Sequence, residues 1–258
     1  MRFLFLTLFL TSCASSPVQI PPFHEEPAPV EQPTTPPTDA TPAPKPSVME
    51  STCPKPGVFQ AVDLSQPVTP RFLATMKYLG IKKIIRYGDH VNETIKGKTP
   101  KAAEIKAILD AGFEFEAVFQ HNNRWARRDG TLYNTFTSAR GTQDAERMRE
   151  LYPNLPRWWY GVDFDVVNST QMAAVEKYAA SFKVVAEKYG KEVGAYGSGY
   201  SLRILREKGL IKWRWISMST GFRETRTAMN AKAYDLLQTL DRDCGGINVD
   251  FNHVNGSW

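Results

Sequence analysis

The run Trp158-Trp159-Tyr160-Gly161-Val162-Asp163-Phe164-Asp165 decides how the folded part of this sequence is interpreted. Its length and its aromatic and β-branched residues are typical of one buried strand. Side chains alternate between the two faces of a strand, so Asp163 and Asp165 share a face. Val162 and Phe164 suit the face that packs against helices. The run therefore predicts a buried strand whose end carries two acids on the side away from the helices.

The alternation of strand and helix continues on both sides of this run. Strands are predicted at 58–63, 83–87, 114–120, 158–165, 192–196, 213–218, 235–239 and 246–251, and helices at 69–79, 100–111, 138–152, 170–189 and 201–208. The links 219–234 and 240–245 are short and less clearly helical. Alternating strands and helices indicate a parallel sheet, and eight strands in about 200 residues predict a single α/β domain of the (β/α)8 TIM-type barrel class.

An open, doubly wound sheet is the main alternative fold. It would place a glycine-rich phosphate loop at the first turn from strand to helix, but residues 63–67 read Asp-Leu-Ser-Gln-Pro. The stretch Gly194-Ala195-Tyr196-Gly197-Ser198-Gly199 also lacks the G-x-G-x-x-G spacing. The sequence therefore favours the barrel.

Three predicted strands end in aspartates: Asp63 in the first, Asp163 and Asp165 in the fourth, and Asp250 in the eighth. The carboxyl ends of barrel strands form the mouth where the chemistry of such folds takes place. Carboxylates gathered there repel one another, so that one stays protonated near neutral pH while another stays charged. This combination suits glycosidic bond cleavage. The alternative is that these aspartates cap the helices that follow them or bind buried backbone amides.

The folded part resembles the glycoside-hydrolase-like domain related to the family-25 glycoside hydrolases, the lysozyme-type muramidases. The resemblance covers nearly all of residues 57–252 and rests on five pieces in order: Ala61-Val62-Asp63-Leu64-Ser65, Ile85-Arg86-Tyr87-Gly88, Tyr160-Gly161-Val162-Asp163-Phe164-Asp165, Gly194-Ala195-Tyr196-Gly197 and Val249-Asp250-Phe251-Asn252. It implies a cell-wall glycan substrate, with Asp63, Asp163 and Asp250 lining the site and Asp165 as the proton donor.

One departure from the lysozyme-type pattern lies in the fourth strand. Those enzymes have Asp-x-Glu where this chain has Asp163-Phe164-Asp165. The side chain of Asp165 is one methylene shorter, and a displacement of about 1 Å can cost roughly 100-fold in rate. Two hypotheses follow: a glycosidase with Asp165 as general acid, or a non-catalytic wall-binding or scaffold protein that keeps the cleft.

Aromatic and amide side chains near predicted strand ends are candidate sugar contacts. The aromatic candidates are Tyr87, Trp125, Tyr196 and Trp215, and the amide candidates are Gln120 and Gln238. The alternative for the aromatic residues is a place in the core. Trp158 and Trp159 are expected to pack under helices or fill the barrel.

The N-terminus reads as a bacterial lipoprotein signal. Arg2 precedes an apolar run that ends in Leu10-Thr11-Ser12-Cys13, so residues 1–12 are predicted to be removed and Cys13 lipidated. Residues 13–50 hold most of the prolines and predict a disordered, extended linker, with a proline-rich ligand as the alternative. The barrel then spans 51–258. Ala14 after the cysteine favours the periplasmic face of the outer membrane.

Two of the three cysteines lie just before predicted strands. Cys53 precedes the first strand and Cys244 the eighth. The first and eighth strands of a closed barrel are neighbours, so both thiols are expected at the N-terminal rim, where they can form a disulfide in an oxidising compartment. Two free thiols are the alternative.

Charge and composition limit the partners. The chain has 32 basic and 27 acidic residues, and the linker is acidic, so the positive charge lies on the folded part and favours an anionic partner. No apolar run suits a multipass membrane protein, and no basic cluster exceeds 124–128, which argues against nucleic acid. The histidines lack metal-ligand spacing. We expect a monomer without metal or cofactor that meets peptidoglycan and a membrane through its lipid.

Overall fold

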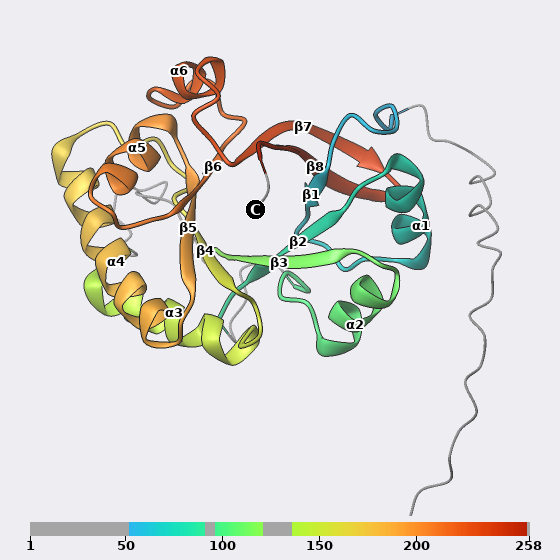
Figure 1. Cartoon of the computed structure of the whole chain (residues 1–258), viewed down its shortest axis with the longest axis horizontal. Helices are drawn as coiled ribbons and strands as arrows, with labels where there is room; N and C mark the ends of the chain where they lie inside the picture. Colours follow the sequence, from blue (N-terminus) through green and yellow to red (C-terminus); the bar gives the residue numbers. More distant parts are fainter. Residues whose placement is uncertain (1–51, 91–95, 121–135, 257–258) are drawn as a thin grey trace, which may run out of the picture. The chain divides into compact units, whose positions relative to one another are not determined.

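A computed structural model describes residues 52–90, 96–120 and 136–256, which form a closed barrel of eight strands in sequence order (Figure 1). The strands are β1 (Ala61–Asp63), β2 (Lys83–Gly88), β3 (Glu114–Phe119), β4 (Arg157–Gly161), β5 (Glu192–Gly197), β6 (Trp213–Ile216), β7 (Leu236–Cys244) and β8 (Ile247–Val254). The predicted barrel is confirmed. The predictions for Cys13 and for residues 1–50 lie outside the described residues.

The last strand runs against the others, which corrects the expected all-parallel sheet. β1 to β7 pair in parallel, whereas β8 is antiparallel to both β7 and β1. The predicted link 240–245 belongs mostly to β7, and Gly245 and Gly246, both with positive φ, make the turn. Parallel strands need a long crossover, but a two-residue turn joins antiparallel strands. β7 and β8 therefore form a hairpin.

Six helices link the strands around the barrel in the described part of the chain (Figure 1). They are α1 (Pro70–Leu79), α2 (Ala102–Asp110), α3 (Ser138–Leu151), α4 (Ser169–Lys188), α5 (Gly199–Glu207) and α6 (Thr225–Asn230). Side chains of Thr69, Thr137, Asn168 and Ser198 accept hydrogen bonds from the first turns of α1, α3, α4 and α5, as N-cap residues do. Among the described residues, no helix is both long and apolar enough to cross a membrane.

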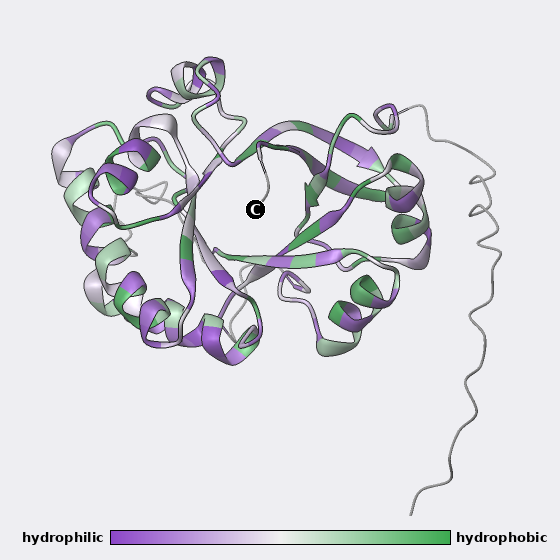
Figure 2. Cartoon of the chain, viewed as in Figure 1, coloured by the Kyte–Doolittle hydropathy of each residue, from purple (hydrophilic) through white to green (hydrophobic). Residues whose placement is uncertain are grey.

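Apolar side chains form two layers, one on each side of the strands. Trp158 belongs to the outer layer between strands and helices, and Trp159 to the inner layer that fills the barrel. The inner layer draws its buried members from six strands: Ala61, Ile85, Val118, Trp159, Trp215 and Leu236. Figure 2 shows green, apolar segments alternating with purple ones along the strands. Side chains therefore fill the interior of the barrel, so a functional site has to lie at one of its two ends.

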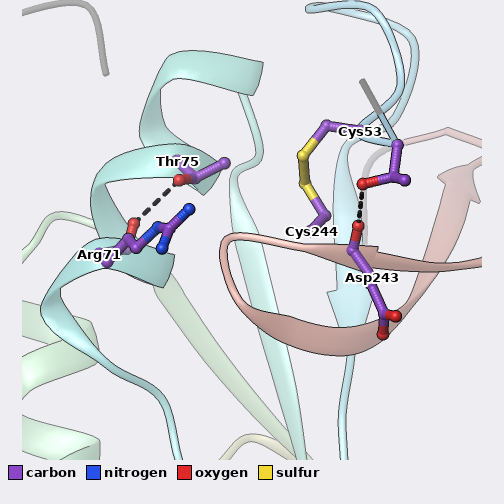
Figure 3. The surroundings of a disulfide bond; sticks show 6 residues. Cys53, Arg71, Thr75, Asp243 and Cys244 are labelled. Carbon is purple, nitrogen blue, oxygen red and sulfur yellow. Dashed lines mark hydrogen bonds between the residues drawn. A yellow bond between two sulfur atoms is a disulfide. The ribbon is translucent and has the colours of Figure 1, made fainter. Parts of the chain in front are cut away.

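A disulfide joins Cys53 and Cys244 over a sequence separation of 191 residues. It lies beside α1, and the Thr52 hydroxyl donates to the Asp243 carbonyl next to it at 2.5 Å (Figure 3). The predicted position at the N-terminal rim is wrong, because Cys244 ends β7 instead of preceding a parallel strand. The hairpin turn packs on α1, where a Cβ on Gly245 would meet the Phe72 Cα at 3.0 Å.

Candidate active site

Asp63 is the central acid at the carboxyl end of the barrel. It is the last residue of β1 and has no exposed surface. Its carboxylate accepts from the Tyr87 hydroxyl at 2.7 Å, from Asn252 Nδ2 at 2.8 Å and from Gln238 Nε2 at 3.3 and 3.4 Å. These donors come from β2, β8 and β7. All are neutral, so they orient the carboxylate without adding a positive charge.

A second ring of hydrogen bonds holds these donors in place. Asn252 Oδ1 accepts from the Trp215 indole nitrogen at 2.8 Å. Gln238 Oε1 accepts from the Tyr196 hydroxyl at 2.9 Å, and that hydroxyl lies 3.0 Å from Ser217 Oγ. Because both ends of each amide are engaged, the orientation of Asn252 and Gln238 is fixed. The network pre-organises Asp63.

Two carboxyls at the mouth keep their protons to unusually high pH. Complete burial raises the pKa of Asp63 to about 6, although the three hydrogen bonds favour its charged form and oppose the rise. Partial burial and the charges of Asp63, Asp241 and Asp163 raise the pKa of Asp250 to about 8. Burial and these acids also raise the phenol pKa values of Tyr87 and Tyr196. At neutral pH, Asp250 is therefore a protonated acid next to charged carboxylates.

Asp163 is the exposed acid of the site. It lies two residues beyond the end of β4, and its Oδ2 accepts from Gln120 Nε2 at 2.9 Å. Val162 and Phe164 on either side are buried, as predicted. Asp163 contributes to the raised pKa of Asp63 and of Asp250, which places it near both. The structure thus brings Asp63, Asp163 and Asp250 together.

Asp165 takes a different position from the one predicted. β4 ends at Gly161, so the strand alternation that paired Asp165 with Asp163 does not extend to it. Asp165 is half-buried, and its Oδ1 accepts from the Arg223 backbone N–H at 2.8 Å. Asp165 therefore holds the loop after β6, and its role as proton donor stays a prediction.

Several predicted sugar contacts have structural roles. Trp215 is 1% exposed and Gln238 4%, so both lie beneath the mouth and hold the network around Asp63, where the prediction had them contact sugar directly. Tyr87, Gln120 and Tyr196 are half-buried at the mouth and remain candidates. Trp125 lies outside the described residues.

Sequence reasoning missed two charged residues at this end of the barrel. Lys98 is 5% exposed, donates to the Gln120 carbonyl, and lies 5.1 Å from the centre of the Tyr87 ring. No periodic pattern surrounds Lys98, so nothing in the sequence marked it. Asp241 lies on β7 opposite Asp250. The predicted strand ended at residue 239, which excluded Asp241 from consideration.

Within the described ranges, no group of three or more His, Cys, Asp or Glu side chains is arranged to hold a metal ion. The Asp63 and Asp163 carboxylates accept from neutral amide and phenol donors instead. The arrangement suits proton transfer and the stabilisation of a developing positive charge.

Sequence comparison identifies the domain. Residues 74–248 match the family model described as the Rv2525c-like, glycoside hydrolase-like domain. The chain belongs to this family. The matched residues of the Rv2525c-like domain include Asp163, Asp165 and Asp241, and they begin after Asp63 and end before Asp250. A search of curated proteins finds no significant match.

Two solved structures with TM-scores above 0.5 support the fold of this Rv2525c-like domain. The Tat-secreted protein Rv2525c of Mycobacterium tuberculosis, in complex with L-tartrate, has a TM-score of 0.62 at 18% identity, over 78% of this chain and 97% of that one. A B. stearothermophilus protein has a TM-score of 0.53 at 16% identity, over 77% of this chain and 96% of that one. A muramidase from Acremonium alcalophilum has a TM-score of 0.45 at 12% identity, over 76% of this chain and 93% of that one.

Proposed function

We propose that this protein is a cell-envelope glycoside hydrolase that acts on the glycan strands of peptidoglycan. The observation that carries the proposal is the juxtaposition of Asp63, fully buried and held by three neutral donors, with the high-pKa carboxyl of Asp250. Glycosidases need one carboxyl that gives a proton at neutral pH and another that stays charged. These acids supply both states at one mouth.

Each carboxyl has a separate role in this proposal. Asp250 donates its proton to the oxygen of the leaving sugar. Asp163, exposed and oriented by Gln120, acts as the base or nucleophile on the sugar ring. Asp63 stabilises the positive charge that develops on the ring, because its oxygens already accept three side-chain donors and are poorly placed to attack.

The envelope location and the substrate rest on charge and on the N-terminal sequence. Residues 1–12 and Cys13 have the pattern of a lipoprotein signal, and residues 14–50 supply a proline-rich linker. An export signal agrees with the family, in which Rv2525c itself is Tat-secreted. The basic folded part favours an anionic polymer such as the bacterial cell wall.

A non-catalytic wall-binding protein is the second candidate. It is favoured by Asp165, which stands where related lysozymes have their acidic Glu and which accepts from a backbone amide. In that case the cleft would hold a glycan strand without cutting it.

Purified peptidoglycan distinguishes the two candidates. We expect the full chain, with Cys13→Ser to keep it soluble, to release reducing ends, Asp250→Asn to abolish release without loss of co-sedimentation, and Asp165→Asn to retain turnover. If the protein with its site unchanged co-sediments with peptidoglycan but releases no reducing ends, the result supports the non-catalytic binding protein. If the protein neither binds nor cleaves peptidoglycan, both candidate functions are refuted. The anomer formed first, observed by NMR, separates retention from inversion.

A further inference from the structure

Three aspartates lie in one row across three adjacent strands. Asp63 on β1 is the register partner of Asp250 on β8, and Asp250 is the register partner of Asp241 on β7. Both pairings are antiparallel, and directly opposite residues of antiparallel strands point to the same face, with Cβ atoms about 4.5–5.5 Å apart. Asp250 therefore has a carboxyl neighbour on each side.

A bulge in β7 places Asp241 in this row. The register shifts between Gln238 and Leu240, so Thr239 has no partner on β8. Gln238 points to the site, and uninterrupted alternation would send Leu240 the same way and Asp241 outward. Instead Leu240 pairs with Phe251 and packs against the outer core, and Asp241 faces the mouth.

The row has no cation to neutralise it within the described residues. Asp63 and Asp250 form no ion pair with a described lysine, arginine or histidine. The other titratable groups that act on Asp250 are Asp163 and the phenols of Tyr87 and Tyr196, none of which brings a positive charge. Asp241 itself is exposed, and its Oδ1 accepts from Asn248 Nδ2 at 2.6 Å.

Like charges directly opposite one another destabilise a strand pair, and protonation of one member removes the repulsion. The middle carboxyl meets a neighbour on both sides, so a proton there relieves two repulsions at once. The end carboxyls each meet only one neighbour in the row. The proton of the row therefore belongs on Asp250.

We propose that Asp241 is a positioning residue whose carboxylate, opposite Asp250 on β7, keeps the proton on Asp250 and so sets the pH range in which the mouth offers an acid. The catalytic meaning of this proton rests on the proposed function. Its location is a property of the folded protein and can be measured without substrate.

The test is a carbon-detected NMR titration of the Asp250 carboxyl in the full chain carrying Cys13→Ser, with the signal assigned by its loss in Asp250→Asn. Asp241→Asn keeps the shape of the side chain and an oxygen for Asn248. We expect it to lower the titration midpoint of Asp250 by about 0.5 pH units, a modest effect because Asp241 is exposed. Asp241→Glu restores the charge and should move the midpoint back.

Asp243→Asn is the matched control, since Asp243 is an exposed acid on the same strand two residues further along. It should leave the midpoint of Asp250 unchanged. An unchanged or higher midpoint in Asp241→Asn, or an equal fall in Asp243→Asn, would overturn the proposal. If the protein cleaves glycan, the basic limb of its pH–rate profile should move to lower pH by the same amount in Asp241→Asn. Absence of cleavage would affect only the proposed function, because the titration stands by itself.

Discussion

Asn252 and Asp63 are 189 residues apart in the chain, and Asn252 Nδ2 donates to Asp63 Oδ2 at 2.8 Å. This bond spans the seam where the first and last strands close the barrel. Asn252 also accepts from Trp215, so one side chain connects the site to the aromatic interior. The closure of the barrel and the orientation of the central acid thus depend on the same residue.

Replacing Asn252 tests this connection. Asn252→Ala leaves the Trp215 indole N–H and the Asp63 carboxylate without their buried partner, so we expect the free energy of unfolding to fall by about 2–3 kcal/mol. The pKa of Asp63 should rise further, because a hydrogen bond that favours its charged form is lost. Urea denaturation measures the first effect. Asn248→Ala, an exposed amide on the same strand, should change stability by less than about 0.5 kcal/mol.

Stability should depend on pH through a second buried acid on the inner face of the barrel. Burial raises the pKa of Glu116 to about 7, against the opposing charges of Arg157 and Lys83. An acid whose folded pKa exceeds its unfolded value of 4.5 costs nothing below that pH; its penalty grows as pH rises from 4.5 to about 7 and is constant above that. Glu116→Gln removes this penalty, so its stability relative to the wild type should increase by up to about 3 kcal/mol between pH 4.5 and 7.

Denaturant titrations at several pH values measure this difference. Glu114→Gln, an exposed carboxyl on the same strand, is the control and should show no comparable increase. A flat difference between Glu116→Gln and the wild type would contradict the assignment. Asp63 and Asp250 add to the decline of wild-type stability over the same range, since both pKa values are raised from 3.8.

The disulfide should contribute strongly to stability. Cys53→Ser with Cys244→Ser opens a loop whose ends are separated by 191 residues, which the chain-entropy model values at up to about 5 kcal/mol. Thermal unfolding of the oxidised protein, the reduced protein and the double variant checks this. Cys13→Ser should have no effect on the melting temperature. Equal melting of the double variant and the oxidised protein would show that the bond stabilises little.

The interior below the site should not tolerate added volume at Gly194. A Cβ there would meet the Trp159 ring at 2.3 Å, and Trp159 packs edge-on against Trp215 at 6.1 Å. We expect Gly194→Ala to destabilise the protein by about 1–3 kcal/mol and to shift the near-ultraviolet circular dichroism of the tryptophans. Gly221→Ala, with no atom within 4 Å of its Cβ, is the matched control and should be neutral.

Local patterns predicted the barrel and three of the acids that lie at its mouth. Val62, Val162 and Phe251 are buried, as the alternation required, and Asp63, Asp163 and Asp250 meet at the mouth. Asp63 ends its strand as predicted, whereas Asp163 lies two residues beyond the end of β4. Asp250 reaches the mouth for a different reason from the predicted one, because it lies within the antiparallel β8 and its register pairs it with Asp63.

The remaining features depend on events that no local period records. The predicted strand ended at residue 239, and the bulge at Thr239 changes the face of every later residue of β7, so that Asp241 points to the mouth. The end of β4 at Gly161 releases Asp165 from the alternation. Trp215 and Gln238 have polar atoms that suit sugars, but these atoms bond Asn252 and Asp63, which lie on strands far away in the sequence. Only the assembled barrel shows which polar side chains are already engaged.

β1 contributes three residues to the ring, yet it carries Asp63 and separates β2 from β8. The chain enters β1 shortly after Cys53, whose sulfur is bonded to the far end of β7. For a protein attached through its N-terminus, mechanical tension from the anchor arrives at this cysteine first. The covalent bond passes part of that load to the β7–β8 hairpin, so that tension at the N-terminus is shared between β1 and the strands beside it.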